Sequence, residues 1–331
     1  KPRRRPKIRG CYGRTQKRRI LLKIMIRNFL FHRVHSRRDP LWDPMDPILF
    51  EKCIIYIKKN FKVRIFEELM TSGDYKKGAE YATIMLDDGY KDNIDIALPI
   101  LEKHNVKATF YIVTDCIEKN IPTWTHTLEY CFQNLNQKQI KLDFKFLPQE
   151  LRNVIFDQKT SPLTYARALK PKLKKIDHSS RLLVLQRIQE IAKIDELPKL
   201  MMNWDDIKKL ISKGHYVGSH TVNHFMLGTV DDENIIIKEL KESREIIHSK
   251  LGFYPKTISY PVGSYNKATI TLSQKLGYQF GLAVKQDIFN PDKHSKFEIP
   301  RIELYNENWF KTRLRISHIL EKIKFLIRYR K

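Results

Sequence analysis

The chain has 331 residues, 62 Lys+Arg against 37 Asp+Glu, a formal net charge of +25, and 42% hydrophobic residues. This apolar content is enough to bury a core and excludes wholesale disorder, and four Cys in a chain of this length exclude a disulfide scaffold. The length suits one large domain or two modest ones.

The basic residues are concentrated at the two ends of the chain. Residues 1–40 hold fifteen Lys+Arg and one acid, residues 307–331 hold eight and two, and residues 41–306 carry a net charge of only +5. A nucleic-acid enzyme would spread basic residues along a groove of its folded domain, so we expect no nucleic-acid partner. Basic ends suit contact with an anionic membrane surface, or are simply solvated tails.

Residues 20–34 have apolar side chains at helical spacing, interleaved with cationic ones. The segment is too short and too charged to span a bilayer. It is predicted to form a cationic amphipathic helix that lies at a membrane interface or packs on the main domain. We therefore expect a cytoplasmic, membrane-associated protein; because the chain begins with Lys1, a cell-envelope or secreted location stays open if a signal precedes it.

Short apolar runs alternate with amphipathic helices from Tyr81 onward. Strands are predicted at 81–86, 108–114, 215–220, 257–262, 278–284 and 298–304, and helices between them at 92–104, 203–213 and 231–251. Asn203 is a suitable N-cap for the second helix, and Gly252 ends the third. This alternation predicts a parallel sheet or an α/β barrel.

Residues 117–202 interrupt this alternation. They show helical patterns at 127–136, 161–170 and 180–194, with Pro171 as a natural stop for the second, and no convincing strand. We interpret the stretch as a helical insertion after the second strand. The expected organisation is a basic tail and amphipathic segment at 1–40, a catalytic domain at 41–306, and a basic C-terminal helix at 307–331.

The four Cys are expected to be separate reduced thiols rather than to form a Cys116–Cys131 bridge.

Three polar clusters follow predicted strands, where a parallel α/β domain places its active site. The first is Asp87-Asp88-Gly89, in which adjacent carboxylates point in different directions, so that one can bind a cation while the other faces a substrate. Without the other clusters it would be read as a turn that caps a helix.

The second cluster contains His220 and His224, which share a face if the segment is a helical turn and can then chelate one metal ion. A packed and a solvent-facing His is the alternative for an isolated pair. No Glu follows His220, so the metalloprotease pattern is absent. A third ligand must come from elsewhere in the chain, and Asp87-Asp88 is the obvious source.

The third cluster is the turn Tyr260-Pro261-Val262-Gly263, where backbone N–H groups can approach a substrate closely. Alone, it is an ordinary strand-to-helix turn.

Together and in this order, the clusters resemble the polysaccharide deacetylase family, carbohydrate esterase family four, with its nodulation-type chitooligosaccharide deacetylase domain. The family's Thr-Phe-Asp-Asp-Gly motif corresponds to 85–89, its His-Ser/Thr-x-x-His motif to 220–224, and its Pro-x-Gly ending to 261–263. The resemblance covers about 81–304 and implies an irregular (β/α) barrel of about seven strands.

The resemblance implies that Asp87 is the general base, that Asp88, His220 and His224 are metal ligands, and that Val262 lends its backbone N–H to the oxyanion. The residue chemistry agrees, because a divalent ion on two imidazoles and a carboxylate keeps open positions and activates water. The donors suit Zn²⁺ but also accept Co²⁺, Fe²⁺ or Ni²⁺.

Two features depart from the family pattern. Many members carry an Arg where this chain has Ser259, and we expect Arg301 on the last strand to take its place beside the base. The general acid stays unassigned, because neither His294 nor His318 has the context of the family's last motif.

The expected reaction is metal-dependent N-deacetylation of N-acetylhexosamine in a glycan or glycan precursor, including cell-envelope glycans. Tyr260, Pro261 and Gly263 are predicted to contact the substrate, as is Trp124, for which simple packing is an equal alternative. A weakly active or inactive glycan-binding protein of the same fold is the second hypothesis.

Overall fold

The computed structural model describes residues 24–76 and 78–320, and its centre is a parallel sheet in the order β10-β1-β3-β4-β7-β8-β9, with β2 also paired to β3. The strands are β1 (Met25–Phe31), β2 (Lys62–Val63), β3 (Glu80–Leu86), β4 (Thr109–Ile112), β7 (Tyr216–Ser219), β8 (Thr257–Ser259), β9 (Phe280–Leu282) and β10 (Ile302–Glu303). Leu282 of β9 also forms a parallel bridge to Ile299, just before β10. The sheet therefore curls into the irregular (β/α) barrel that the sequence predicts.

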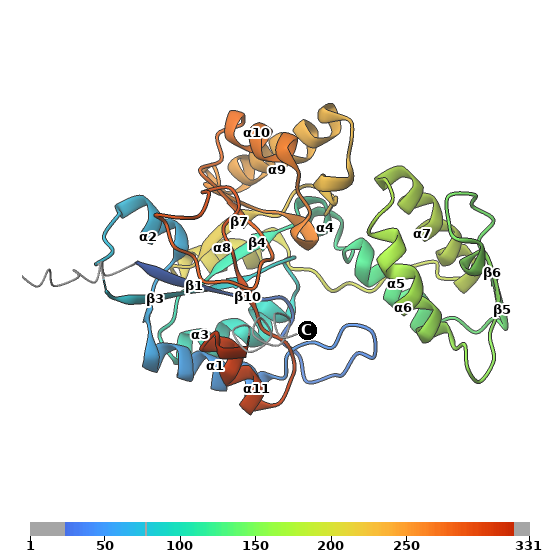
Figure 1. Ribbon diagram of the computed structural model, residues 1–331, viewed down its shortest axis with the longest axis horizontal. Helices are drawn as coiled ribbons and strands as arrows, with labels where there is room; N and C mark the ends of the chain where they lie inside the picture. Colours follow the sequence, from blue (N-terminus) through green and yellow to red (C-terminus); the bar gives the residue numbers. More distant parts are fainter. Residues whose placement is uncertain (1–23, 77, 321–331) are drawn as a thin grey trace, which may run out of the picture.

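Helices cover the outside of this sheet, with α9 and α10 on one side and α1, α3 and α11 on another (Figure 1). They are α1 (Pro47–Asn60), α2 (Phe66–Ser72), α3 (Leu98–Lys103) with a π-helical turn before it (Asn93–Ala97), α4 (Thr114–Lys119), α8 (Trp204–Ser212), α9 (Glu233–Leu251), α10 (Lys267–Lys275) and α11 (Trp309–Ile316). Two predicted ends are confirmed, because Asn203 caps α8 and Gly252, with φ of 79°, ends α9.

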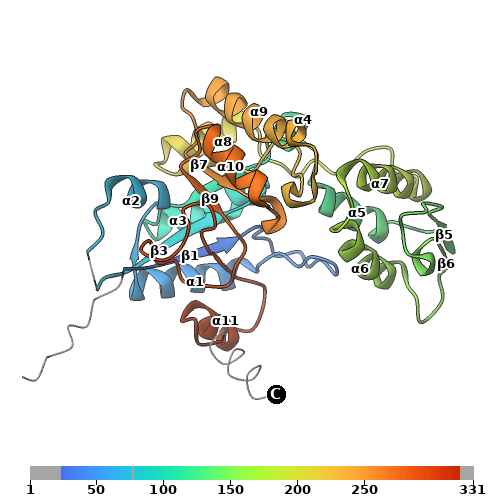
Figure 2. The same cartoon turned by 45° about the horizontal axis from the view of Figure 1, so that its top comes forward.

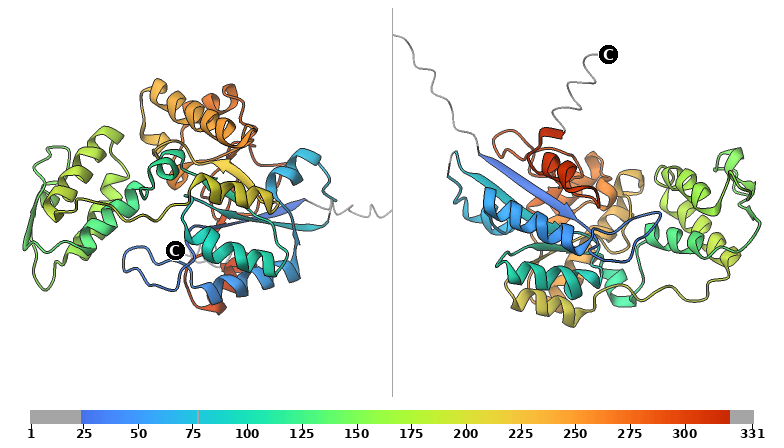
Figure 3. Two further views of the ribbon diagram at one scale, coloured as in Figure 1. Left: turned by 180° about the vertical axis from the view of Figure 1, so that it is seen from behind. Right: turned by 90° about the horizontal axis from the view of Figure 1, so that it is seen from below.

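The insertion between β4 and β7 forms a separate lobe beside the barrel (Figures 1 and 3). It contains α5 (Trp124–Gln133), α6 (Pro162–Leu173), α7 (His178–Ala192) and a two-stranded antiparallel sheet of β5 (Gln139–Lys141) and β6 (Asn153–Ile155), with a 3₁₀ turn at Gln149–Leu151. Its apolar side chains form their own cluster. The short β5–β6 pair was not predicted, and Pro171 lies inside the last turn of α6, which ends two residues later.

The prediction of an amphipathic helix at residues 20–34 is wrong for the part that the structure describes. Met25–Phe31 is strand β1, which lies between β3 and β10, so the barrel begins before residue 41. A strand covered on both faces reads as an almost continuous apolar run. Arg27 within β1 and the cationic residues on either side of the strand mimic the spacing of an amphipathic helix. Arg27 pairs with Glu80 at 3.2 Å, and its guanidinium lies over the Phe61 ring. The apolar side chains of β1 are buried in the core, so this strand has no exposed apolar face that could contact a bilayer.

Three of the four Cys lie within the described residues, and Cys53, Cys116 and Cys131 are buried free thiols, as expected. Cys11 and residues 20–23 lie outside the described part, as do residues 321–331 of the predicted C-terminal helix. Of the helices that the structure describes, none is long and apolar enough to cross a membrane.

Candidate metal centre and active site

The three predicted polar clusters meet at one end of the barrel, because each follows the carboxyl end of a parallel strand. Asp87 and Asp88 follow β3, His220 and His224 follow β7, and the Pro-x-Gly turn follows β8. They border a cavity of about 230 Å³. Its lining residues are His32, Trp42, Asp87, Asp88, Thr125, Lys170, Lys174, His220, His224, Val262, Val284 and Glu303.

The ligand atoms of Asp88, His220 and His224 all lie within 4.8 Å of one another. Asp88 Oδ1 is 3.3 Å from Nε2 of both imidazoles, and all three side chains are buried. His220 Nδ1 lies 2.7 Å from the carbonyl oxygen of Ser259, which orients Nε2 toward the carboxylate. Asp88 Oδ1 has no hydrogen-bond partner of good geometry among the described residues. A buried oxygen facing two imidazole nitrogens fits a divalent cation.

The charges of the three groups act on one another. Burial alone would raise the pKa of Asp88, but the two imidazoles hold it well below the ordinary value. Burial would lower the pKa of His220, yet the charges of Asp87 and Asp88 raise it, whereas for His224 burial prevails and the pKa is lowered. The carboxylate is therefore ionised and ready to coordinate.

The segment that carries the two His is not the helical turn that the sequence suggested. It is a loop in which Thr221 (φ 67°) and His224 (φ 58°) adopt left-handed backbone. The buried carboxylate of Glu239 on α9 accepts hydrogen bonds from the backbone N–H of Val222 (3.1 Å) and Asn223 (2.9 Å) and from Asn223 Nδ2 (2.6 Å). Glu239 thus holds the loop that brings His220 and His224 together.

Left-handed backbone recurs elsewhere at the site, at Asp88 (φ 77°) and at Val262 (φ 57°). Such conformations cost a non-glycine residue of the order of 1–3 kcal/mol each, most of all a β-branched one, and they concentrate where function requires them. At Asp88 the turn lets two consecutive carboxylates serve different partners.

Asp87 is bound on both of its oxygens. Arg301 Nη1 donates to Oδ1 at 2.9 Å, and Ser259 Oγ donates to Oδ2 at 2.9 Å. Burial would raise the pKa of Asp87, but the charges of Arg301 and His220 lower it. The contact expected between Arg301 and Asp87 is therefore present, and Ser259, which stands where many relatives have Arg, binds the same carboxylate.

The residues of the turn after β8 lie at different depths. Val262 lines the cavity, whereas Tyr260 and Pro261 are buried, with the Tyr260 ring packed 4.9 Å from that of Tyr265. Gly263 has φ of 68°, and a Cβ there would lie 2.8 Å from Val284 Cβ. Of these four residues, Val262 is the one the structure places on the cavity wall; the substrate contacts expected of the others stay predictions.

Trp124 is not among the residues that line the cavity of Asp88, His220 and His224. It starts α5, is almost fully buried beneath the Arg181 guanidinium at 4.8 Å, and lines a neighbouring cavity of about 580 Å³ together with Phe225. Trp124 thus both packs and lines a cavity, and its contact with a substrate stays a prediction.

Sequence reasoning missed four residues that line the cavity. They are His32, Glu303, and the two lysines of the insertion, Lys170 and Lys174. His32 directly follows β1, and its Nδ1 lies 3.7 Å from Glu303 Oε1 at the end of β10. The signal was available: if residues 25–31 are read as a strand, His32 is a polar residue at a strand end like the other site residues. The lysines come from the insertion, whose docking on the barrel no local pattern predicts.

Comparison with known proteins identifies the family. The sequence profile of the polysaccharide deacetylase family matches residues 74–281, which is more than half of the chain. The chain therefore belongs to the polysaccharide deacetylase family, whose members are hydrolases that act on amide bonds. β1, His32 and Arg301 lie outside the matched residues.

A curated relative is the polysaccharide deacetylase homologue YxkH of Bacillus subtilis, which is 21% identical over 225 residues. The match covers 68% of this chain and 52% of YxkH, so the chain spans about half the length of that relative.

Solved structures show the same fold at low identity. The deacetylase PplD of Streptococcus pyogenes, in complex with acetate, has a TM-score of 0.57 at 16% identity, covering 88% of this chain and 98% of that one. IcaB from Ammonifex degensii has a TM-score of 0.57 at 13% identity, covering 89% and 98%. A de-N-acetylase from Aggregatibacter actinomycetemcomitans has a TM-score of 0.56 at 15% identity, covering 88% and 99%.

Proposed function

We propose that this protein is a metal-dependent N-deacetylase that hydrolyses the acetamido group of N-acetylhexosamine in a glycan or glycan precursor. The observation that carries the proposal is the buried Asp88–His220–His224 cluster with Asp87 beside it in one cavity. A divalent ion held there, Zn²⁺ or else Co²⁺, Fe²⁺ or Ni²⁺, would polarise the acetyl oxygen and lower the pKa of a water molecule.

Asp87 is the proposed general base. Its carboxylate takes a proton from the water that attacks the acetyl carbon, while Arg301 and Ser259 hold both oxygens in a fixed orientation. Because its pKa is lowered, Asp87 is ionised and able to accept that proton at neutral pH. The Val262 backbone N–H is the proposed donor to the oxygen on which charge develops.

His32 is the proposed proton donor to the leaving amine. It lines the same cavity, and its charge acts on both Asp87 and Asp88. Glu303 and the Trp42 ring, whose centroid lies 5.4 Å from that of His32, fix its position. Imidazole is the side chain that enzymes use most often for general acid–base catalysis.

The test is acetate release from N-acetylated oligosaccharides by the metal-loaded protein. Asp87→Asn should keep its metal yet lose at least about a hundredfold in kcat, because an amide cannot accept the proton. Asp95→Asn, on an exposed position of the π-helical turn after β3, is the matched control and should keep the wild-type rate. Wild-type turnover by Asp87→Asn would remove that residue from the mechanism, and no acetate from any N-acetylated glycan would refute the function.

A further inference from the structure

Two lysines of the insertion line the catalytic cavity although the proposed chemistry uses neither. Lys170 lies in α6, and Lys174 is the residue that ends this helix. Lys170 Nζ forms an ion pair with the buried carboxylate of Glu129, so its charge is balanced. The Lys174 side chain makes no hydrogen bond or ion pair with any residue in the described ranges.

The Lys174 ammonium is therefore a positive charge without a fixed counter-ion. The side chain is half-buried, and burial together with the neighbouring charge of Lys170 lowers its pKa. A cation that is partly removed from water is unfavourable unless an anion or a hydrogen-bond acceptor offsets the loss of hydration. An anionic group bound in the cavity would supply that compensation.

The carboxylates that line the cavity already have other partners. Asp87 is bound by Arg301, and Asp88 faces the two imidazoles. Glu303 and Glu129 are the anions that act on Lys174 at longer range. Glu303 lies 3.7 Å from His32 and accepts a hydrogen bond from the Tyr305 hydroxyl at 2.6 Å, and Glu129 is paired with Lys170. The positive charge of Lys174 is therefore not balanced by a carboxylate that lines the cavity.

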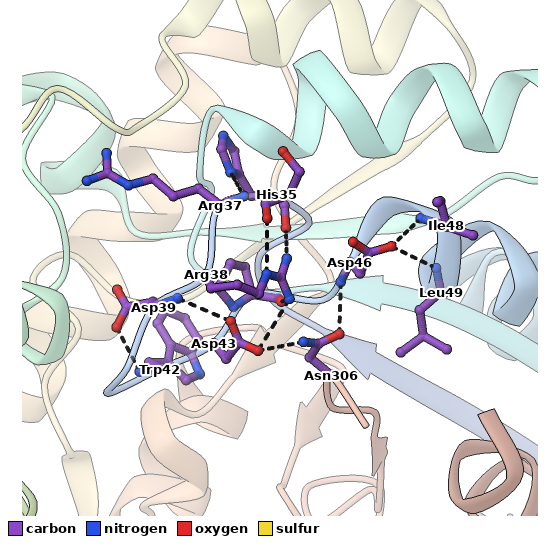
Figure 4. Close-up of polar contacts among 12 residues, drawn as sticks. His35, Arg37, Arg38, Asp39, Trp42, Asp43, Asp46, Ile48, Leu49 and Asn306 are labelled. Atoms are coloured by element: carbon purple, nitrogen blue, oxygen red, sulfur yellow. Dashed lines mark hydrogen bonds and ion pairs between the residues drawn. The ribbon is translucent and has the colours of Figure 1, made fainter. Parts of the chain in front are cut away.

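A second cavity of about 530 Å³ has three arginines and Asp39 in its lining, and two of these arginines, Arg33 and Arg38, are paired with aspartates. Consecutive residues line the two cavities, His32 and Thr125 in the catalytic one, and Arg33 and His126 in its neighbour. Arg37 also lines the second cavity, and among the described residues its guanidinium has no ion-pair partner. Figure 4 shows the Arg37 side chain extending away from the contacts that fix the loop after β1.

We propose that Lys174 binds an anionic oxygen group, carboxylate or phosphate, carried by the glycan next to the sugar that is deacetylated. The substrate class is then an acidic glycan or a sugar phosphate rather than a neutral polymer such as chitin. This inference rests on the proposed function for the placement of the sugar, while the anion site itself rests on Lys174 and its surroundings.

Binding of already deacetylated sugars tests the anion site without any turnover. The ligands are glucosamine, glucosamine 1-phosphate and the disaccharide of glucuronic acid and glucosamine, titrated by calorimetry into the metal-loaded protein. All three carry the same amine. Glucosamine and glucosamine 1-phosphate differ in the phosphate alone, whereas the disaccharide adds a whole sugar ring with its carboxylate, so for that ligand the comparison with Lys174→Gln isolates the effect of the anion. The matched pair of variants is Lys174→Gln and Lys172→Gln, which remove the same charge from the end of α6, the latter at an exposed position.

We expect the anionic ligands to bind roughly tenfold or more tightly than glucosamine, as a charge-assisted hydrogen bond provides. Lys174→Gln should abolish this advantage, Lys172→Gln should keep it, and the ligand with the larger loss tells phosphate from carboxylate. Equal or undetectable binding of the three ligands, or an advantage that survives Lys174→Gln, would overturn the inference. A failure of acetate release, in contrast, would leave this binding result unchanged and would count against the proposed function alone.

Discussion

Two consecutive carboxylates have different environments at this site, and the different roles proposed for them rest on that difference. Asp87 is bound by a guanidinium and a hydroxyl, whereas Asp88 faces two imidazoles and turns away through a backbone φ of 77°. The adjacency of the pair is visible in the sequence, and so is the His pair. The partner of Asp87 is less visible, because Arg301 is 214 residues away along the chain and only the closure of the barrel brings them together.

Arg301→Lys should reduce kcat by about tenfold or more and shift the pH profile. Lys lacks the planar fork that can bind Asp87 Oδ1 and the Ala283 carbonyl oxygen at the same time. Arg301 lowers the pKa of Asp87, and the base works when ionised, so activity is lost as the pH falls through that pKa. A weaker partner raises the pKa, and the acidic limb of the kcat–pH profile should move to higher pH. An unchanged rate and profile would contradict the role given to Arg301.

At the scale of elements, the proposed metal ligands His220 and His224 lie on a loop rather than on a regular helix. The spacing of His220 and His224 suggested a helical face, but left-handed residues and the Glu239 carboxylate shape the segment instead. Sequence patterns identified the six strands from β3 to β10 that belong to the main sheet, because buried parallel strands read as apolar runs. They could not identify this loop, since its conformation is set by a side chain of α9.

Glu239→Gln should therefore weaken metal binding, although Glu239 is not one of the three proposed ligands. An amide group offers one acceptor oxygen in place of two, so part of the set of hydrogen bonds to Val222 and Asn223 is lost. We expect divalent-metal affinity to fall by roughly tenfold or more, as for other groups that orient ligands. Glu242→Gln, on an exposed position of the same helix, is the control. Equal metal affinity in both variants and the wild type would show that Glu239 has no such positioning role.

For the whole molecule, the N-terminal region belongs to the barrel. β1 pairs with β3 over seven residues and with β10 over two, and Figure 2 shows it running through the sheet beside β3. The prediction failed here because an apolar strand with Arg27 inside it and further cationic residues on either side resembles an amphipathic helix. The insertion was located correctly from its break in alternation, but its contribution of lysines to the active site depends on tertiary docking.

Removal of residues 1–40 should abolish folding rather than release a membrane anchor. Ile26, Phe29, Leu30 and Phe31 are buried on β1, and each such side chain contributes about 1.5–3 kcal/mol. Their sum is comparable with the whole stability of an ordinary domain, about 5–15 kcal/mol. Thermal unfolding followed by circular dichroism should show no cooperative transition in the shortened chain. A cooperative transition near that of the full chain would contradict the central place of β1.

The metal content of the purified protein tests the central claim most directly. Elemental analysis should find about one divalent metal ion per chain in the wild type and nearly none in His220→Ala, because the cluster loses one of its three ligands. His248→Ala, on α9 and outside the cluster, should retain the wild-type content. Equal metal content in the wild type and His220→Ala, whether near one or near zero, would contradict the metal centre on which the proposed chemistry depends.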